Sequence, residues 1–180
     1  MKLTSTIYFS TLHSSVGWLT LARTKKGLCR IDFGREETGL KRLRSWAQKH
    51  FLNNRIARDD QALADVKAQL EQYFAGKRKA FDCELQLIGT AFQKMVWSAL
   101  MDIPYGEVRS YKEVAQAIGS PKAVRAVGSA NHCNTISIIV PCHRVIGSNG
   151  ALIGYASGLE KKRKLLALEG ALHLCDRKKA

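Results

Sequence analysis

Three segments in the second half of the chain begin with a hydroxyl residue that is followed three positions later by Glu or Gln. The pairs are Thr90 with Gln93, Ser110 with Glu113, and Ser157 with Glu160. In such a capping box, the two side chains accept hydrogen bonds from amide groups that the start of a helix leaves unpaired. Each pair therefore predicts the start of a helix, and residues 89–180 are expected to form a mainly helical domain.

Two of these expected helices follow each other almost without a loop. Gly119 ends a helix over 111–118, Ser120 is suited to cap the next helix, and Pro121 fits its first turn because an N–H there has no partner within the helix. This pattern predicts a helix-turn-helix. The second helix then carries a set of basic and small residues: Lys122, Arg125, Ala126, Gly128 and Ser129.

The distribution of charge points to a nucleic-acid partner. The 180 residues include 29 Lys and Arg against 15 Asp and Glu, a formal charge of +14, and such an excess attracts polyanions. No acidic residue occurs between Glu113 and Glu160, so the second helix of the pair is the expected DNA-binding surface. Its small residues favour close approach in the minor groove over side-chain readout in the major groove. An ordinary pair of core helices would fit the same pattern.

The first half of the chain alternates strands with helices. Runs of β-branched and aromatic residues predict strands over 6–12, 17–22 and 27–33, and the spacing of apolar residues predicts helices over 40–51 and 60–74. Alternation of apolar and polar residues over 81–87 predicts a fourth strand with Cys83 in the core. We therefore expect an α/β (α+β) protein, with a small antiparallel sheet and helices in residues 1–88 and the helix-turn-helix domain in residues 89–180.

Composition excludes several other classes of protein. No run of about 18 apolar residues is present, so we expect no membrane span and no membrane partner, and a location in the cytoplasm, or in the nucleus of a eukaryote. Five cysteines without a C-x-x-C pair predict free thiols. Neither a phosphate loop nor a dinucleotide fingerprint occurs, and Cys29, Cys83, His13 and His50 make no zinc ligand set. We expect a monomer without metal or cofactor.

A candidate nucleophile follows a nearly all-apolar run. Residues 136–140 predict a buried strand that Pro141 ends, and Cys142, His143 and Arg144 come next. An imidazole can accept the thiol proton, and a guanidinium favours the thiolate. A lone buried cysteine is, however, more often a packing residue. Because neighbours on a strand point to opposite faces, cysteine and histidine can cooperate only if the proline turns the chain or a water bridges them.

Glu169 is a second unusual residue. It lies at the C-terminal end of the last expected helix, just before Gly170, where the helix dipole disfavours a carboxylate. A cationic or hydrogen-bond donor partner would offset this cost, and His143 is a candidate for that partner. A solvated glutamate would fit the sequence equally well.

Three short runs occur together in an order typical of one family. Residues 125–130 (Arg-Ala-Val-Gly-Ser-Ala), 141–146 (Pro-Cys-His-Arg-Val-Ile) and 154–159 (Gly-Tyr-Ala-Ser-Gly-Leu) resemble the O6-alkylguanine-DNA alkyltransferases, also called methylated-DNA protein-cysteine methyltransferases. The resemblance covers about residues 90–170, and residues 1–88 correspond to the amino-terminal domain by length and element order. It implies a single-turnover repair protein. Such a protein binds double-stranded DNA containing O6-alkylguanine in the minor groove, flips the damaged base, and moves its alkyl group irreversibly to a cysteine, with O4 of thymine as a second source.

The resemblance also implies a role for each matched residue. Cys142 is the alkyl acceptor, His143 links it through a water to Glu169, and Tyr111 rotates the nucleotide and donates to the base. Arg125 fills the space that the flipped base leaves. The other residues contact DNA (Lys122, Ala126, Gly128 and Ser129), line the substrate pocket (Tyr155, Ala156 and Val145), or tie the recognition helix, the second of the helix-turn-helix, to the active-site strand (Asn134). Thr135 and Ala156 stand where the family usually has Pro and Ser.

Two other classes of protein share part of this pattern. A sensor that binds alkylated DNA without repairing it would have the helix-turn-helix but would lack the acceptor cysteine, which is present here as Cys142. A cysteine hydrolase would also use Cys and His, but nothing in the sequence resembles its substrate site, and the charge of +14 favours DNA.

Overall fold

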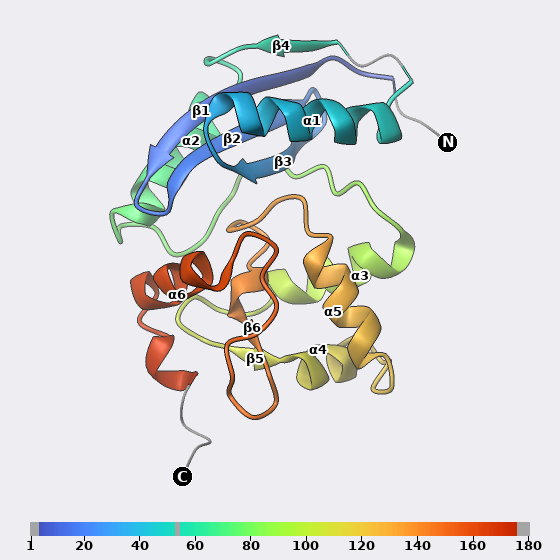
Figure 1. Cartoon of the computed structure of the whole chain (residues 1–180), viewed down its shortest axis with the longest axis vertical. Helices are drawn as coiled ribbons and strands as arrows, with labels where there is room; N and C mark the ends of the chain where they lie inside the picture. Colours follow the sequence, from blue (N-terminus) through green and yellow to red (C-terminus); the bar gives the residue numbers. More distant parts are fainter. Residues whose placement is uncertain (1–3, 53–54, 176–180) are drawn as a thin grey trace. The chain divides into compact units, whose positions relative to one another are not determined.

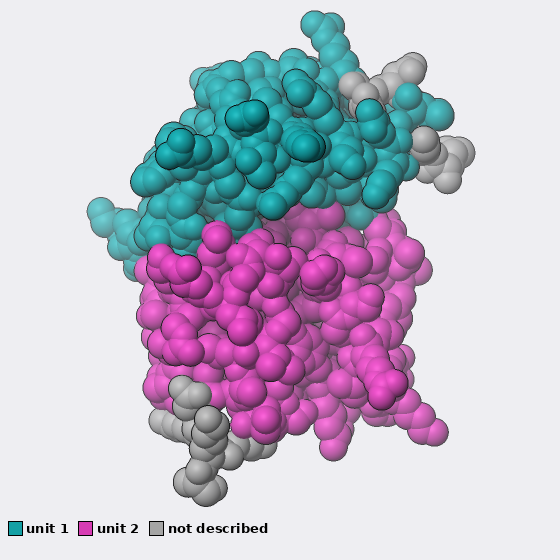
Figure 2. Space-filling view, in the orientation of Figure 1, with its two compact units in different colours: residues 1–88 teal, residues 89–180 magenta. Residues whose placement is uncertain are grey.

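The chain divides into two compact units. The computed structural model describes residues 4–52 and 55–175, and the units comprise residues 1–88 and 89–180 (Figure 2). The boundary falls where the sequence changes from mixed strands and helices to mainly helices. Within the described residues, no helix is both long and apolar enough to cross a membrane.

A four-stranded sheet forms the first unit (Figure 1). The strands are β1 (Ile7–Ser14), β2 (Gly17–Thr24), β3 (Gly27–Phe33) and β4 (Ile56–Arg58), in the order β3-β2-β1-β4. The first three strands pair antiparallel through hairpins, as expected. The short β4 was not expected, and because it pairs parallel to β1, the sheet is mixed rather than wholly antiparallel.

Two helices pack on this sheet. α1 (Glu36–His50) contacts β2 and β3, and α2 (Ala64–Phe74) contacts β1. The close approach of α1 depends on Gly39, because a Cβ there would lie 2.0 Å from Thr20 Oγ1. Both helices were expected, although α1 begins earlier in the chain and α2 later than the apolar spacing indicated. Residues 60–63 form a turn before α2, in which the Ala62 amide donates a hydrogen bond to the side chain of Asp59.

The strand expected over 81–87 does not form. Leu85 makes a single bridge to Leu28 of β3, while the amide of Asp82 donates to a side chain of α2. The segment is thus held at its start by a helix and pairs with the sheet through a single bridge, so no ladder develops. Cys83 is accordingly half-buried and not a core residue.

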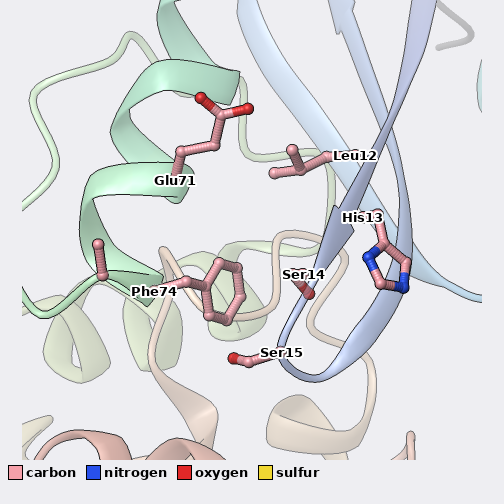
Figure 3. A pocket seen from close by; sticks show the side chains of 7 residues that line it. Leu12, His13, Ser14, Ser15, Glu71 and Phe74 are labelled. Atoms are coloured by element: carbon pink, nitrogen blue, oxygen red, sulfur yellow. The ribbon is translucent and has the colours of Figure 1, made fainter.

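The first unit also has a surface pocket (Figure 3). Residues 12–15 line it from the end of β1 and the following turn, and Glu71, Phe74 and Ala75 line it from the C-terminal end of α2. None of these residues was expected to act in the reaction. The expected site residues all lie in the second unit.

The second unit is mainly helical, which together with the sheet of the first unit confirms the expected fold class. Its elements are α3 (Ala91–Met101), β5 (Arg109–Ser110), α4 (Tyr111–Ala117), α5 (Val124–His132), the 3-10 turn η1 (Cys142–Arg144), β6 (Val145–Ile146), α6 (Leu159–Leu168) and the 3-10 turn η2 (Leu172–Leu174). β5 and β6 form a parallel pair.

Two of the three capping boxes are confirmed. Thr90 Oγ1 and Ser110 Oγ each accept a hydrogen bond at 3.2 Å from the amide three residues on, and the Gln or Glu there accepts one from the capping residue in return. The third box is wrong. α6 begins after Gly158, whose φ of 96° favours glycine, and no side chain caps it. Ser157 lies one residue too early for that position.

α4 and α5 form the helix-turn-helix and pack against α3. The turn is longer than expected, because α5 begins only at Val124. Within the turn, the Ala123 amide donates to the Ser120 carbonyl at 2.8 Å. Ser120 therefore contributes its backbone and not a side-chain cap, and Lys122 lies in the turn instead of on the helix.

Candidate active site and DNA-binding surface

The segment before Cys142 forms a tight turn and not the expected strand. The Val140 amide donates back to the Ile136 carbonyl at 2.9 Å, and Ile138 has a φ of 80°, a conformation that costs a β-branched residue on the order of 1–3 kcal/mol. Asn134, just after α5, holds the turn from both sides. Its Nδ2 donates to the Val140 carbonyl at 2.8 Å, and its Oδ1 accepts from the Ile136 amide at 3.0 Å. One side chain thus connects the end of α5 to the turn.

Cys142 begins η1 and is only 4% exposed. Burial raises the pKa of its thiol above the ordinary value, while hydrogen bonding with Asn134, the positive charge of Lys162 and hydrogen bonding with Ser137 act in the opposite direction. These three groups favour the thiolate, which is the nucleophilic form of cysteine.

Pro141 turns the chain, so that Cys142 and His143 are neighbours on a 3-10 turn instead of on a strand. On a strand, neighbouring side chains point to opposite faces, and this constraint does not apply to the turn. Among the described residues, no direct hydrogen bond joins the two side chains, and His143 Nδ1 has no hydrogen-bond partner.

His143, Arg144 and Glu169 form a buried hydrogen-bonded cluster. His143 Nε2 lies 2.8 Å from Glu169 Oε1. Arg144 binds both carboxylate oxygens, from Nε to Oε2 at 2.8 Å and from Nη2 to Oε1 at 2.9 Å. The His143 and Glu169 side chains are 0% exposed. Glu169 is therefore not a solvated residue at the end of α6, because two donors compensate its charge.

The cluster fixes the protonation states of its members. Burial favours a raised pKa for Glu169, but hydrogen bonds from His143 and Arg144 outweigh it and lower the pKa to about 2. Burial lowers the pKa of His143 despite the contact with the carboxylate, so the imidazole is neutral near pH 7. With Nε2 donating to Glu169, Nδ1 carries the lone pair. The cluster thus supplies a neutral base beside Cys142 in the chain.

The segment between α3 and β5 closes over the carboxylate. Arg144 Nη1 donates to the Ile103 carbonyl at 2.5 Å, and the Gly106 amide lies 3.4 Å from Glu169 Oε2. Tyr105 Oη donates to the last carbonyl of α6 at 2.9 Å, and its ring centroid lies 5.9 Å from the Arg144 guanidinium carbon. These contacts hold the orientation of the buried ions.

Lys162 on α6 is a site residue that the sequence analysis missed. It is fully buried, and its Nζ donates to the carbonyls of Val145 at 2.5 Å and Ile153 at 2.6 Å. Lys162 thereby ties β6 to the loop that precedes α6. Burial lowers its pKa to about 8, with the nearby Cys142 acting in the opposite direction.

A signal for this lysine was present in its spacing. Lys162 precedes Leu165 and Leu166 by three and four residues, an interval that places all three on one face of a helix. Asn131 was also missed, although it too lies on the buried face of its helix, α5. Its Nδ2 lies 3.3 Å from the Cys142 carbonyl.

Tyr111 lies between α5 and the loop before α6. Its hydroxyl is 3.2 Å from the carbonyl of Gly154 and 3.4 Å from that of Ile153. A Cβ on Gly154 would lie 2.5 Å from this hydroxyl, and a Cβ on Gly128 would lie 3.9 Å from the ring. Burial raises the pKa of Tyr111, so its hydroxyl remains protonated and able to donate.

The remaining expected pocket residues differ in their burial and in their relation to the cysteine. Burial, followed by the proximity of Cys142, raises the pKa of Tyr155 well above its ordinary value, while hydrogen bonding with Ser137 opposes the shift. Val145 is buried in β6. Ala156 is exposed on the loop before α6.

The expected DNA-binding residues share an exposed face of the helix-turn-helix. Val127 and Ala130 are the buried residues of α5 that point to the core. The opposite side carries Arg125, Ala126 and Ser129, all exposed, with Gly128 half-buried and Lys122 exposed in the preceding turn. α5 therefore packs as an ordinary core helix on one face only, and its other face is exposed.

The fold and the site define a helix-turn-helix protein with a buried cysteine beside a histidine–glutamate–arginine cluster. Residues 91–171 match the family described as "6-O-methylguanine DNA methyltransferase, DNA binding domain". Residues 7–87 match "6-O-methylguanine DNA methyltransferase, ribonuclease-like domain". The chain belongs to the 6-O-methylguanine DNA methyltransferase family.

Individual relatives are similar over almost the whole chain. The methylated-DNA–protein-cysteine methyltransferase of Methanosarcina acetivorans is 47% identical over 165 residues, which cover 92% of this chain and 99% of the relative. The O6-methylguanine methyltransferase structure from Mycobacterium tuberculosis has a TM-score of 0.77 at 45% identity, covering 91% of this chain and 93% of that one. A Mycobacterium tuberculosis relative in complex with DNA has a TM-score of 0.77 at 44% identity and covers 92% of each chain.

Proposed function

We propose that this chain repairs alkylated DNA by moving an alkyl group from O6 of guanine to the sulfur of Cys142, once per molecule. The observation that carries the proposal is the buried cysteine followed by His143, whose ring is bonded at 2.8 Å to Glu169. A methyltransferase relative that is 47% identical over nearly its full length supports the same reaction.

The proposed step exchanges one bond for another. The thiol of Cys142 gives its proton, through one water, to Nδ1 of His143, and the sulfur forms a bond to the alkyl carbon as the bond from that carbon to guanine O6 breaks. The electron pair of the broken bond goes to the base, to which the Tyr111 hydroxyl donates a hydrogen bond. The base takes up a proton from water to become ordinary guanine, and the proton held by His143 returns to water. The Ala156 amide is a second donor to the charge that develops on the base. An alkyl group on O4 of thymine would react in the same way.

The product is the reason for a single turnover. A thioether has no carbonyl that water could attack, unlike the acyl-enzyme of a cysteine hydrolase. The alkylated protein therefore has no hydrolytic route back to the free thiol, and each molecule is consumed in one event.

The partner is double-stranded DNA, approached through the minor groove by α5 as a monomer. Small exposed residues such as Ala126 allow close approach, and Arg125 takes the place of the flipped base. Flipping costs a few kcal/mol, which an inserted side chain and a stacking pocket lined by Tyr155 offset. A DNA partner also implies a location in the cytoplasm, or in the nucleus of a eukaryote.

The test is a stoichiometric repair assay. Excess duplex containing O6-methylguanine is mixed with the intact protein, restored guanines are counted, and the added mass is located by peptide mapping. We expect one guanine restored per protein molecule, with the methyl group on Cys142. Restoration far beyond one equivalent, or a methyl group on Cys175, would contradict the proposal. Binding without any restoration would instead favour the sensor class.

A variant at Arg125 separates base flipping from chemistry. Arg125→Ala is expected to slow repair of duplex tenfold or more. The inserted side chain offsets part of the free-energy cost of base flipping, and losing about 1.4 kcal/mol of that offset slows the reaction tenfold. The rate on the free O6-methylguanine base should not change, because no stack has to be held open. Arg163→Ala, which removes an exposed arginine of α6, is the matched control. Equal losses on the two substrates would contradict the role of Arg125.

A further inference from the structure

The outer face of α1 carries basic residues that have no partners. Residues 38–58 contain six Lys or Arg and no Asp or Glu. Within this stretch, Lys41, Arg44 and Lys49 are all exposed on α1. In the part of the chain that the structure describes, none of these three side chains has an ion-pair or hydrogen-bond partner.

Five other basic residues that the structure describes in the first unit form ion pairs with its acids. Ion pairs join Arg23 to Asp65, Arg30 to Asp32, Arg58 to Glu36 and Asp60, Lys67 to Asp60, and Arg78 to Asp82. The acids of α1 itself, Glu36 and Glu37, both lie in its first turn. On α1, the unpaired cations Lys41, Arg44 and Lys49 therefore all follow this first turn.

The helix dipole does not account for this arrangement. Cations at the C-terminal end of a helix are stabilised by the dipole, but the effect falls off within the last turn. Only Lys49 and His50 belong to the last turn of α1, whereas Lys41 and Arg44 lie nearer its middle. Stabilisation by the helix dipole therefore does not explain the positions of these two cations.

The spacing of the three cations suits a nucleic-acid backbone. Lys41 and Lys49 are eight residues apart, about 12 Å along a helix that rises 1.5 Å per residue. One strand of duplex DNA carries a phosphate about every 3.4 Å of helix axis, so this length of α1 spans three to four phosphates. Thr38, Ser45 and Gln48 share the exposed surface with the cations and are further donors to phosphate oxygens.

The composition of the face favours DNA over a membrane surface. An amphipathic helix that binds a membrane buries apolar side chains in the headgroup region. None of the exposed residues of α1 is apolar, and its apolar residues Leu43, Trp46 and Ala47 are buried against the sheet. The helix has nothing to insert into a lipid layer.

We propose that Lys41, Arg44 and Lys49 form a second DNA-contacting surface, which binds the phosphate backbone of duplex DNA without reading its sequence. This inference rests on the proposed repair function and extends it to the first unit, whose helix then adds to the affinity that α5 provides. The expected contribution is electrostatic and therefore depends on salt.

The test compares two triple variants that each remove three positive charges. One is K41Q/R44Q/K49Q on α1, and the control is K25Q/K26Q/K77Q, which changes exposed lysines of the same unit outside α1. Gln has nearly the helix propensity of Lys and Arg, so α1 should persist. Affinity for a duplex of several helical turns is measured between about 50 and 200 mM salt, where each lost phosphate contact lowers the slope of log affinity against log salt by about 0.9.

We expect the α1 variant to lower this slope by about 2.7, the value for three phosphate contacts, and the control to change it by much less. Transfer from free O6-methylguanine base should be the same in both variants. Equal slopes in the two variants would overturn the proposal, as would an unchanged DNA slope together with lost binding to anionic lipid vesicles. Wild-type protein that restores no guanine would refute the repair function itself, which is a separate outcome.

Discussion

Replacing Cys142 by alanine is expected to abolish alkyl transfer while leaving duplex binding intact. The thiolate is the nucleophile, and Asn134, Lys162 and Ser137 favour that form at Cys142. Alanine removes the sulfur and little volume, so the helix-turn-helix should keep its shape. Transfer is measured with duplex labelled on the methyl group, and binding by fluorescence anisotropy of the same duplex.

Other cysteines provide the matched control for this variant. Cys133 is exposed at the end of α5, so Cys133→Ala should transfer a full equivalent. Cys29 is buried in the first unit, where burial raises its pKa to about 12, and it should carry no label. Transfer that survives in Cys142→Ala, or that disappears in Cys133→Ala, would show that the acceptor has been assigned wrongly.

Local signals predicted much of the fold. The strands β1 to β3 were found because their runs of β-branched and aromatic residues are long and are separated by short turns. The starts of α3 and α4 were found because a capping box depends only on residues three positions apart. Where sequence-local chemistry determines an element, the sequence is sufficient to place it.

Elements that depend on distant partners could not be predicted in this way. β4 has three residues, too few for a periodic pattern, and exists because β1 offers it an edge. Residues 81–87 alternate like a strand but are drawn to α2 instead. The run before Cys142 is apolar like a strand, yet the side chain of Asn134 folds it into a turn in which Ile138 adopts a positive φ.

The candidate site follows the same division. Cys142 and His143 could be found because they are adjacent in the sequence, and Glu169 because its place at a helix end is unfavourable without a partner. Lys162 and Asn131 were missed because their importance arises from the carbonyls that they reach, at Val145, Ile153 and Cys142. Those contacts exist only once the chain has folded.

Glu169→Ala is expected to lower the free energy of unfolding by about 3–5 kcal/mol, the cost of removing one partner from a buried ion pair. The substitution leaves the Arg144 guanidinium buried with a single carbonyl partner, at Ile103, and leaves His143 Nε2 without its acceptor. Relief of the unfavourable helix-end position, at most about 1 kcal/mol, is too small to reverse the sign. The measurement is chemical denaturation of the intact protein near pH 7.

The stabilisation by Glu169 also has a defined pH dependence. Its pKa is about 2 in the folded protein, below the ordinary value of 4.5, so the folded state holds the proton less tightly than the unfolded state. The contribution is therefore complete above about pH 5 and is lost as the pH falls from there towards 2. We expect the difference in unfolding free energy between wild type and Glu169→Gln to be largest near neutral pH and to shrink over this acid range.

Two further variants separate this cluster from an ordinary ion pair. Glu160→Ala removes an acid in the first turn of α6 that is exposed and pairs with Lys164, so it should change stability little. If His143 and Glu169 act as one relay, His143→Ala and Glu169→Gln should each slow alkyl transfer, and the double variant should be little slower than the slower single one. Losses that multiply would mean that the two residues act independently.

An unfolding free energy for Glu169→Ala that matches that of Glu160→Ala would mean that the buried cluster does not stabilise the fold, because then the carboxylate would not be neutralising the buried guanidinium.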